Sequence, residues 1–170
     1  MALQETPQDY TARILSFLEM NDPIDVLSST PERLRGLITG RSREDLAWSP
    51  DSSRWSVVQI VAHLADSEIV GAWRFRSILA ADGRPVQPYD QNAWADTFRY
   101  AETDPFASLE LFTVNREATV ALLRRVDPKL HANHGIHGER GIETIEHLVR
   151  LYAGHDLNHL SQVEKLVQDR

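Results

Sequence analysis

Apolar residues recur at the spacing of one helix face along most of the chain. The clearest stretch begins after Trp55-Ser56 and continues for roughly six turns without an internal proline, with apolar positions at Val57, Ile60, Val61, Leu64, Ile69, Trp73 and Ile78. A second stretch runs from around Glu143 to near the C-terminus, with apolar positions at Ile145, Leu148, Leu151, Leu157, Leu160, Val163 and Leu166. Each stretch predicts a long amphipathic helix.

Capping signals predict two further helical segments. Thr103-Asp104-Pro105 is typical of a helix start, and the helix that follows ends at Val126-Asp127-Pro128. At the N-terminus, Thr6-Pro7 starts a helix that ends near residues 21–23. Residues 24–29 predict an irregular or single-turn piece, after which Ser29-Thr30-Pro31 caps a stretch with apolar residues at Leu34, Leu37 and Ile38. The two N-terminal segments would then form one interrupted arm of a bundle.

The connections between these helices are long. Residues 40–53 are rich in charge, Ser, Gly and Pro, and residues 82–90 carry Gly83, Pro85 and Pro88, which predict an extended crossover. No segment alternates apolar and polar residues over a strand's length, so strands have little support. We therefore predict an all-α fold in which residues 1–170 form a single domain, a four-helix bundle with at least one crossover.

Composition narrows the functional classes. The chain has 170 residues, of which 42% are hydrophobic and 25% charged, and its formal net charge is -7. Because that charge repels polyanions, we expect no nucleic acid and no membrane as partner. Cysteine is absent, so any metal must be held by nitrogen and oxygen. The N-terminus shows no signal-peptide pattern, and the cytoplasm is the expected location.

Two histidines at helical spacing are the main chemical signal. His155 and His159 are four residues apart, which on a helix places both rings on one face, roughly 6 Å apart along the axis. Two imidazoles leave a divalent ion short of ligands, and His63, in the densest part of the first apolar stripe, is the best candidate for a third. Taken alone, such a pair also arises by chance, and His63 alone fits a buried histidine bonded to a neighbour.

Other polar residues have weaker claims. Asp66 could orient an imidazole, act as a fourth ligand or pair with Arg74 or Arg76, and the salt bridge is the safest interpretation. Three histidines, His131, His134 and His137, lie in a glycine-spaced loop that does not fix ligand geometry, so we expect them to be solvated. His147 lies about two turns before His155 and roughly 80° around the helix, too far to share the ion.

Three segments together resemble a known family. They are residues 55–68, which include His63; residues 88–94, Pro-Tyr-Asp-Gln-Asn-Ala-Trp; and residues 154–162, Gly-His-Asp-Leu-Asn-His-Leu-Ser-Gln. In this order they are similar to the DinB/YfiT-like superfamily, over most of the chain from about Leu34. The resemblance implies a four-helix bundle, often a homodimer, with zinc or nickel on His63, His155 and His159. It also implies thiol-dependent S-transferase or metal-dependent hydrolase activity on a small molecule.

The chemistry leaves several functions open. A metal on three neutral imidazoles would support hydrolysis, or transfer by the thiolate of a low-molecular-weight cosubstrate, since the chain supplies no cysteine of its own. Asp66 is the nearest carboxylate to nominate as catalytic proton acceptor. A non-catalytic metal-binding stress or sensor protein is the first alternative, and a bundle braced by a structural ion is the second.

Overall fold

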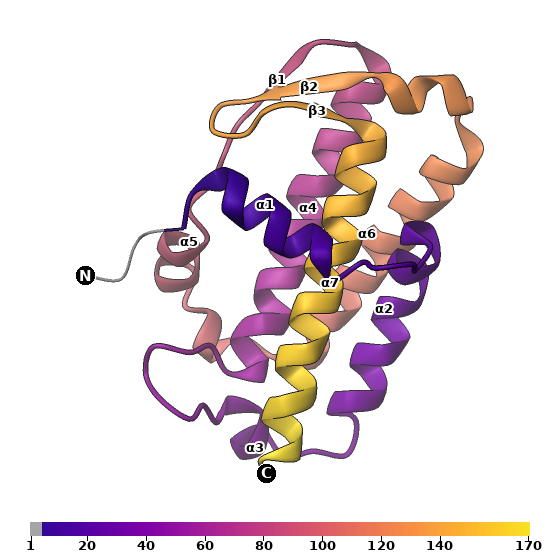
Figure 1. The fold of residues 1–170 in the computed structure, drawn as a ribbon. Helices are drawn as coiled ribbons and strands as arrows, with labels where there is room; N and C mark the ends of the chain where they lie inside the picture. The colour runs from indigo at the N-terminus through magenta and orange to yellow at the C-terminus, as the bar shows by residue number, and fades with distance from the viewer. Residues whose placement is uncertain (1–4) are drawn as a thin grey trace.

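Four long helices form a bundle with a small sheet at one end (Figure 1). The computed structural model describes residues 5–170. The bundle helices are α2 (Pro23–Ile38), α4 (Val57–Ala80), α6 (Pro105–Arg125) and α7 (Ile145–Gln168). The shorter elements are α1 (Pro7–Ser16), α3 (Arg43–Ala47), α5 (Gln91–Thr97), the 3₁₀ turns Tyr100–Glu102 and Pro128–Ala132, and the strands β1 (Arg84–Val86), β2 (His134–His137) and β3 (Gly141–Thr144). The four-helix bundle is confirmed.

Two apolar clusters fix the direction of each bundle helix. The sheet-end cluster contains the end of α4 and the start of α7, whereas the α3-end cluster contains the start of α4 and the end of α7. The same comparison shows that α2 runs parallel to α7 and that α6 runs parallel to α4. Since α4 and α6 pack together and point the same way, residues 81–104 must return along the bundle. This connection is the predicted crossover, and it carries β1 and α5 (Figure 1).

The break expected in the N-terminal arm is wrong. Asp22 caps α2, which continues through Pro31 to Ile38. Proline lacks the N–H that would bond the carbonyl of Leu27 four residues earlier. That carbonyl instead accepts a hydrogen bond from Nη1 of Arg116, on α6, at 3.1 Å. A partner distant in sequence therefore removes much of the cost of proline inside this helix.

The expectation that strands lack support is also wrong. β1 pairs in parallel with β2, and β2 pairs antiparallel with β3 in a hairpin. The paired residues Ile136 and Ile142 face solvent, with 48% and 71% of their surface exposed, while Gly135 and His137 are buried. Because the apolar residues point outward, the alternation lacks the pattern of a strand with an apolar buried face.

Candidate metal centre

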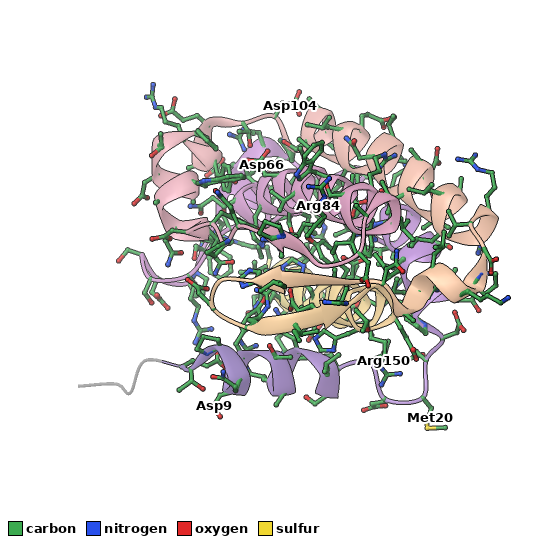
Figure 2. The ribbon with its side chains drawn as sticks, turned by 90° about the horizontal axis from the view of Figure 1, so that it is seen from above. Asp9, Met20, Asp66, Arg84, Asp104 and Arg150 are labelled. Atoms are coloured by element: carbon green, nitrogen blue, oxygen red, sulfur yellow. The ribbon has the colours of Figure 1, made fainter. Side chains whose placement is uncertain are left out.

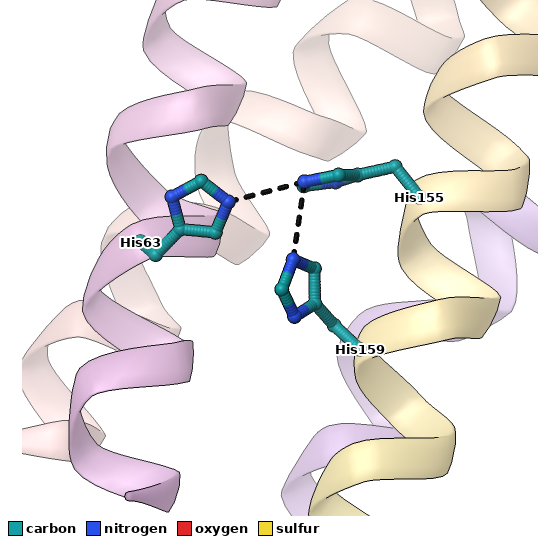
Figure 3. Close-up of side chains that lie close together, drawn as sticks. All are labelled: His63, His155 and His159. Atoms are coloured by element: carbon teal, nitrogen blue, oxygen red, sulfur yellow. Dashed lines mark hydrogen bonds between the residues drawn. The ribbon is translucent and has the colours of Figure 1, made fainter. Parts of the chain in front are cut away.

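Three histidine rings converge between α4 and α7 (Figure 3). Nε2 of His155 lies 3.1 Å from Nε2 of His63 and 3.2 Å from Nε2 of His159. All three side chains are buried, with 1% to 9% of their surface exposed. The structure thus brings together the three histidines singled out from the sequence, although 92 residues separate His63 from His155.

A helix cap on α4 and a glycine on α7 help to position the two helices that carry the histidines. A capping box formed by Ser56 and Gln59 starts α4, so that His63 lies about two turns into the helix. On α7, Gly154 lies where α1 crosses: a Cβ added there would lie 2.2 Å from the carbonyl oxygen of Ile14. Glycine immediately before His155 therefore lets α1 pack directly over the histidine-bearing part of α7.

The donor geometry fits a divalent ion. Imidazole nitrogens about 2.0–2.1 Å from a tetrahedral zinc are about 3.3 Å apart, close to the spacings found here. One N–H on Nε2 of His155 could satisfy only one of its two neighbours, so hydrogen bonding alone does not account for the cluster. Burial lowers the pKa of all three histidines, to about 4 for His159. The rings are therefore neutral at neutral pH, as metal ligands must be.

The tautomer of His159 agrees with this role. Its Nδ1 lies 2.9 Å from Oε1 of Gln162. Because an amide oxygen only accepts, Nδ1 carries the proton and Nε2 keeps its lone pair toward the other rings. Gln162 is thus a positioning residue that only the structure distinguishes within the third sequence segment.

Asp66 does not form the expected salt bridge. Its carboxylate accepts a hydrogen bond from the hydroxyl of Tyr100 at 2.6 Å. Arg74 donates to the carbonyl of Gln87 and Arg76 to that of Ala72, and neither is ion-paired with Asp66 within residues 5–170. Seen from above, Asp66 lies on the opposite side of the bundle from Asp9 of α1 (Figure 2).

The remaining histidines lie outside the trio. His134 pairs with Asp82, and His147 lies 4.0 Å from Glu143 near the start of α7. The expectation of a solvated loop is wrong for His137, which is only 2% exposed in β2. Its Nδ1 accepts the backbone N–H groups of residues 139 and 140, and it shapes the hairpin turn.

A buried ionic network that was not predicted from the sequence directly adjoins the trio. Arg116, Glu68 and Asp156 are each no more than 2% exposed. Arg116 donates through Nε to Glu68 at 2.8 Å and through both terminal nitrogens to Asp156, the residue after His155. A sequence signal exists, because Arg116 lies four residues from Phe112 and from Val120, inside the apolar stripe of its helix.

Two pockets meet at His155. The loop pocket, about 480 Å³, is bordered by the loop around Trp55 and by α7, and it contains His155 and His159. The hairpin pocket, about 270 Å³, lies between α1, α4, α7 and the β2–β3 turn. Tyr10, Gln91 and His155 line both pockets, whereas Asp66 lines neither. His155 is therefore reached from two sides, both next to α1.

The sequence of residues 27–163 matches the family model described as the DinB superfamily. The chain belongs to this superfamily. Its membership confirms the family resemblance carried by the three sequence segments, two of which hold the histidines.

Named relatives and a solved structure are similar to this chain over most of their length. The chain is 28% identical to the Bacillus subtilis protein named "Putative metal-dependent hydrolase YfiT", over 84% of this chain and 81% of that one. A similarly named Oceanobacillus iheyensis protein is 27% identical, over 86% and 85%. The solved structure of Bacillus subtilis YfiT, titled "a probable metal-dependent hydrolase with an unusual four-helix bundle topology", superposes with a TM-score of 0.81 at 28% identity, over 86% and 85% of the two chains.

Proposed function

We propose that this DinB-superfamily protein is a metal-dependent hydrolase of a small molecule, with a divalent ion held by His63, His155 and His159. The observation that carries the proposal is the convergence of three neutral, buried imidazoles on one point at the edge of a pocket. The names of the relatives support the same reaction class. Between residues 5 and 170, no helix has the length and apolar character needed to cross a membrane.

The residues around the trio have distinct tasks in this proposal. A bound divalent ion would supply Lewis acidity, which lowers the pKa of water. Gln162 holds the ring of His159 in the tautomer that offers Nε2. The centroid of the Trp55 ring lies 5.0 Å from that of the His63 ring, so Trp55 covers this histidine on one side. Asn158 is only 9% exposed and lines the loop pocket, where its amide can bond a substrate.

A thiol-dependent transferase is the second candidate. The two pockets that share His155 favour it, because a transfer reaction needs room for two reactants beside one centre. The thiol would have to be a soluble cosubstrate, since the chain contains no cysteine. A metal-binding sensor would have the same trio but no turnover, and it is the remaining alternative.

Metal analysis tests the centre first. Protein purified without a histidine tag should contain close to one equivalent of a divalent ion, with zinc and nickel the expected metals. His159→Gln should lose most of that ion while retaining helical circular dichroism. Absence of metal from the wild-type protein after exposure to zinc and nickel would contradict the proposal.

Substrate screens then separate the reactions. Hydrolysis of esters or amides without added thiol indicates the hydrolase, and thiol-dependent loss of an electrophile indicates the transferase. Metal binding without either activity would favour the sensor. Homodimer formation and the cytoplasmic location stay predictions, which light scattering and cell fractionation test.

A catalytic role for Asp66 is part of the proposal and has its own test. The residue lies one turn along α4 from His63 but bonds Tyr100 outside both pockets. If Asp66 accepts a proton in the reaction, Asp66→Asn should lower kcat by about 100-fold or more. A loss below about tenfold would limit Asp66 to holding Tyr100.

A further inference from the structure

Arg74 is a buried cation in the hairpin pocket, and within residues 5–170 it has no carboxylate partner. Only 5% of its surface is exposed, and Nη2 donates a hydrogen bond to the backbone carbonyl of Gln87. Across residues 5–170, no Asp or Glu oxygen lies within 4.0 Å of its guanidinium. Burying a charge that lacks a counterion is costly, so this position favours an anion from outside the chain.

The other arginines near the centre lack this property. Arg116 is neutralised by Glu68 and Asp156. Arg140, which also lines the hairpin pocket, pairs through two nitrogens with Glu143, at 2.6 and 3.0 Å. Of the two buried arginines in the described part of the chain, Arg74 is the one that keeps donors for a ligand.

The surroundings of Arg74 suit an acid group. Its Cζ lies 5.9 Å from the ring centre of Tyr89, and burial raises the pKa of both Tyr89 and Tyr10, so their hydroxyls stay protonated and able to donate. Two carboxylates also line the pocket. Glu5 is held by Arg13 at 2.7 and 2.9 Å, and Glu139 is exposed. One free guanidinium beside two carboxylates fits a monoanion better than a phosphate dianion.

Arg74 lies on the same face of α4 as His63, one of the three histidines. Eleven residues separate it from His63 on α4, which places it about three turns further along the same helix face, about 16 Å by axial rise. Side chains on a helix lean toward its N-terminus, here toward His63. Arg74 and His155 both line the hairpin pocket, so one molecule bound there can contact both residues.

We propose that the hairpin pocket binds an extended small molecule through a terminal carboxylate at Arg74, with the reacting group of that molecule at the histidine trio. The placement of the reacting group depends on the proposed function, whereas binding of the carboxylate does not. The same recognition would apply to a substrate acid or to an acidic thiol cosubstrate. Comparing acids with and without a thiol group in turnover assays distinguishes these two sources.

Hexanoate and hexanamide are a matched pair of probes, because they share a shape and differ in the carboxylate. Hexanoate should shift the amide NMR signals of residues lining the hairpin pocket, including Ser67 and Arg74, and hexanamide should not. Equal shifts from both probes, or hexanoate shifts confined to other surfaces, would overturn the proposal. Inorganic phosphate that displaces hexanoate at lower concentration would overturn the assignment to a carboxylate.

Two arginine substitutions test where hexanoate binds. Arg74→Gln should weaken hexanoate binding by about 10- to 100-fold, the loss expected for hydrogen bonds to a charged group. Arg76→Gln, on the exposed side of the same helix, should leave binding unchanged. Unaltered hexanoate binding by a folded Arg74→Gln variant would refute the inference. If that variant does not fold, the comparison of hexanoate with hexanamide on wild-type protein still decides.

Hexanoate could also bind through a metal ion, and His159→Gln is the control. Persistent, Arg74-dependent binding in this variant supports the carboxylate site even if the metal centre proves wrong. Binding that disappears with His159 would place the carboxylate at the metal and refute the site at Arg74.

Discussion

Arg116 donates through both terminal nitrogens to the carboxylate of Asp156, the residue that follows His155 on α7. The same guanidinium bonds Glu68 on α4 and the carbonyl of Leu27 on α2. One side chain of α6 therefore joins the other three bundle helices at the level of the histidine trio. This network sets the spacing between the helix that carries His63 and the helix that carries the other two histidines.

Removing Arg116 should destabilise the fold strongly. Arg116→Met leaves two buried carboxylates and the Leu27 carbonyl without their shared donor, and breaking a buried pair costs about 3–5 kcal/mol. Urea unfolding followed by circular dichroism measures the loss. Arg125→Met, at an exposed position at the end of the same helix, should change stability by less than about 0.5 kcal/mol. Equal effects of the two substitutions would contradict the structural role of Arg116.

Gln162 should tune metal affinity without being a ligand. Gln162→Ala frees Nδ1 of His159 and allows the ring to change tautomer, which should weaken zinc binding by about 10- to 100-fold. Competition with a chromogenic chelator measures the affinity. Gln168→Ala, at the exposed end of α7, is the matched control. An unchanged affinity in Gln162→Ala would show that the hydrogen bond does not orient His159.

Substitution by alanine should destabilise the protein at Gly154 and stabilise it at Gly36. Gly154→Ala places a Cβ against the backbone of Ile14, so α1 must move and stability should fall by about 1–3 kcal/mol. Gly36→Ala, inside α2, meets nothing within 4 Å and should stabilise the protein by about 0.5–1 kcal/mol. Thermal unfolding of both variants checks the signs. Tolerance of Gly154→Ala with α1 still packed would contradict the close approach.

His137 should make stability depend on pH. Burial lowers its pKa from 6.5 to about 4, so in the pH range between these values the unfolded chain binds the proton more tightly. Stability from this residue is therefore full above about pH 6.5 and is lost as the pH falls toward 4. Between pH 7 and pH 5 the loss should be at most about 2 kcal/mol, because partial solvent screening reduces it.

The contribution of His137 to the pH dependence of stability is measured by comparing wild type with a His137 variant. Urea unfolding of metal-free wild type and His137→Asn at both pH values isolates it, because all other groups titrate in both proteins. The variant should lose less stability than the wild type on acidification. Parallel curves for His137→Asn and wild type would refute the assignment.

Much of the architecture follows from local sequence. Apolar periodicity and caps such as Ser56 and Asp104 determine where α4 and α6 begin, because helix hydrogen bonds and capping bonds form between near neighbours. The same regularity makes the spacing of His155 and His159 meaningful, since four residues on a helix bring two rings to one face. With His63 in the apolar stripe, the trio could be predicted before the fold was seen.

The tertiary structure decided what depends on partners distant in sequence. Pro31 is accommodated within α2 with Arg116 bonding the carbonyl it leaves free, and β1 forms against β2, about 50 residues later. The ion pairs of Arg116 span 48 and 40 residues, and no local pattern specifies them. The hydrogen bonds of a helix or a cap join residues that are close in sequence. A buried charge, in contrast, is stable only where another segment supplies its counterion.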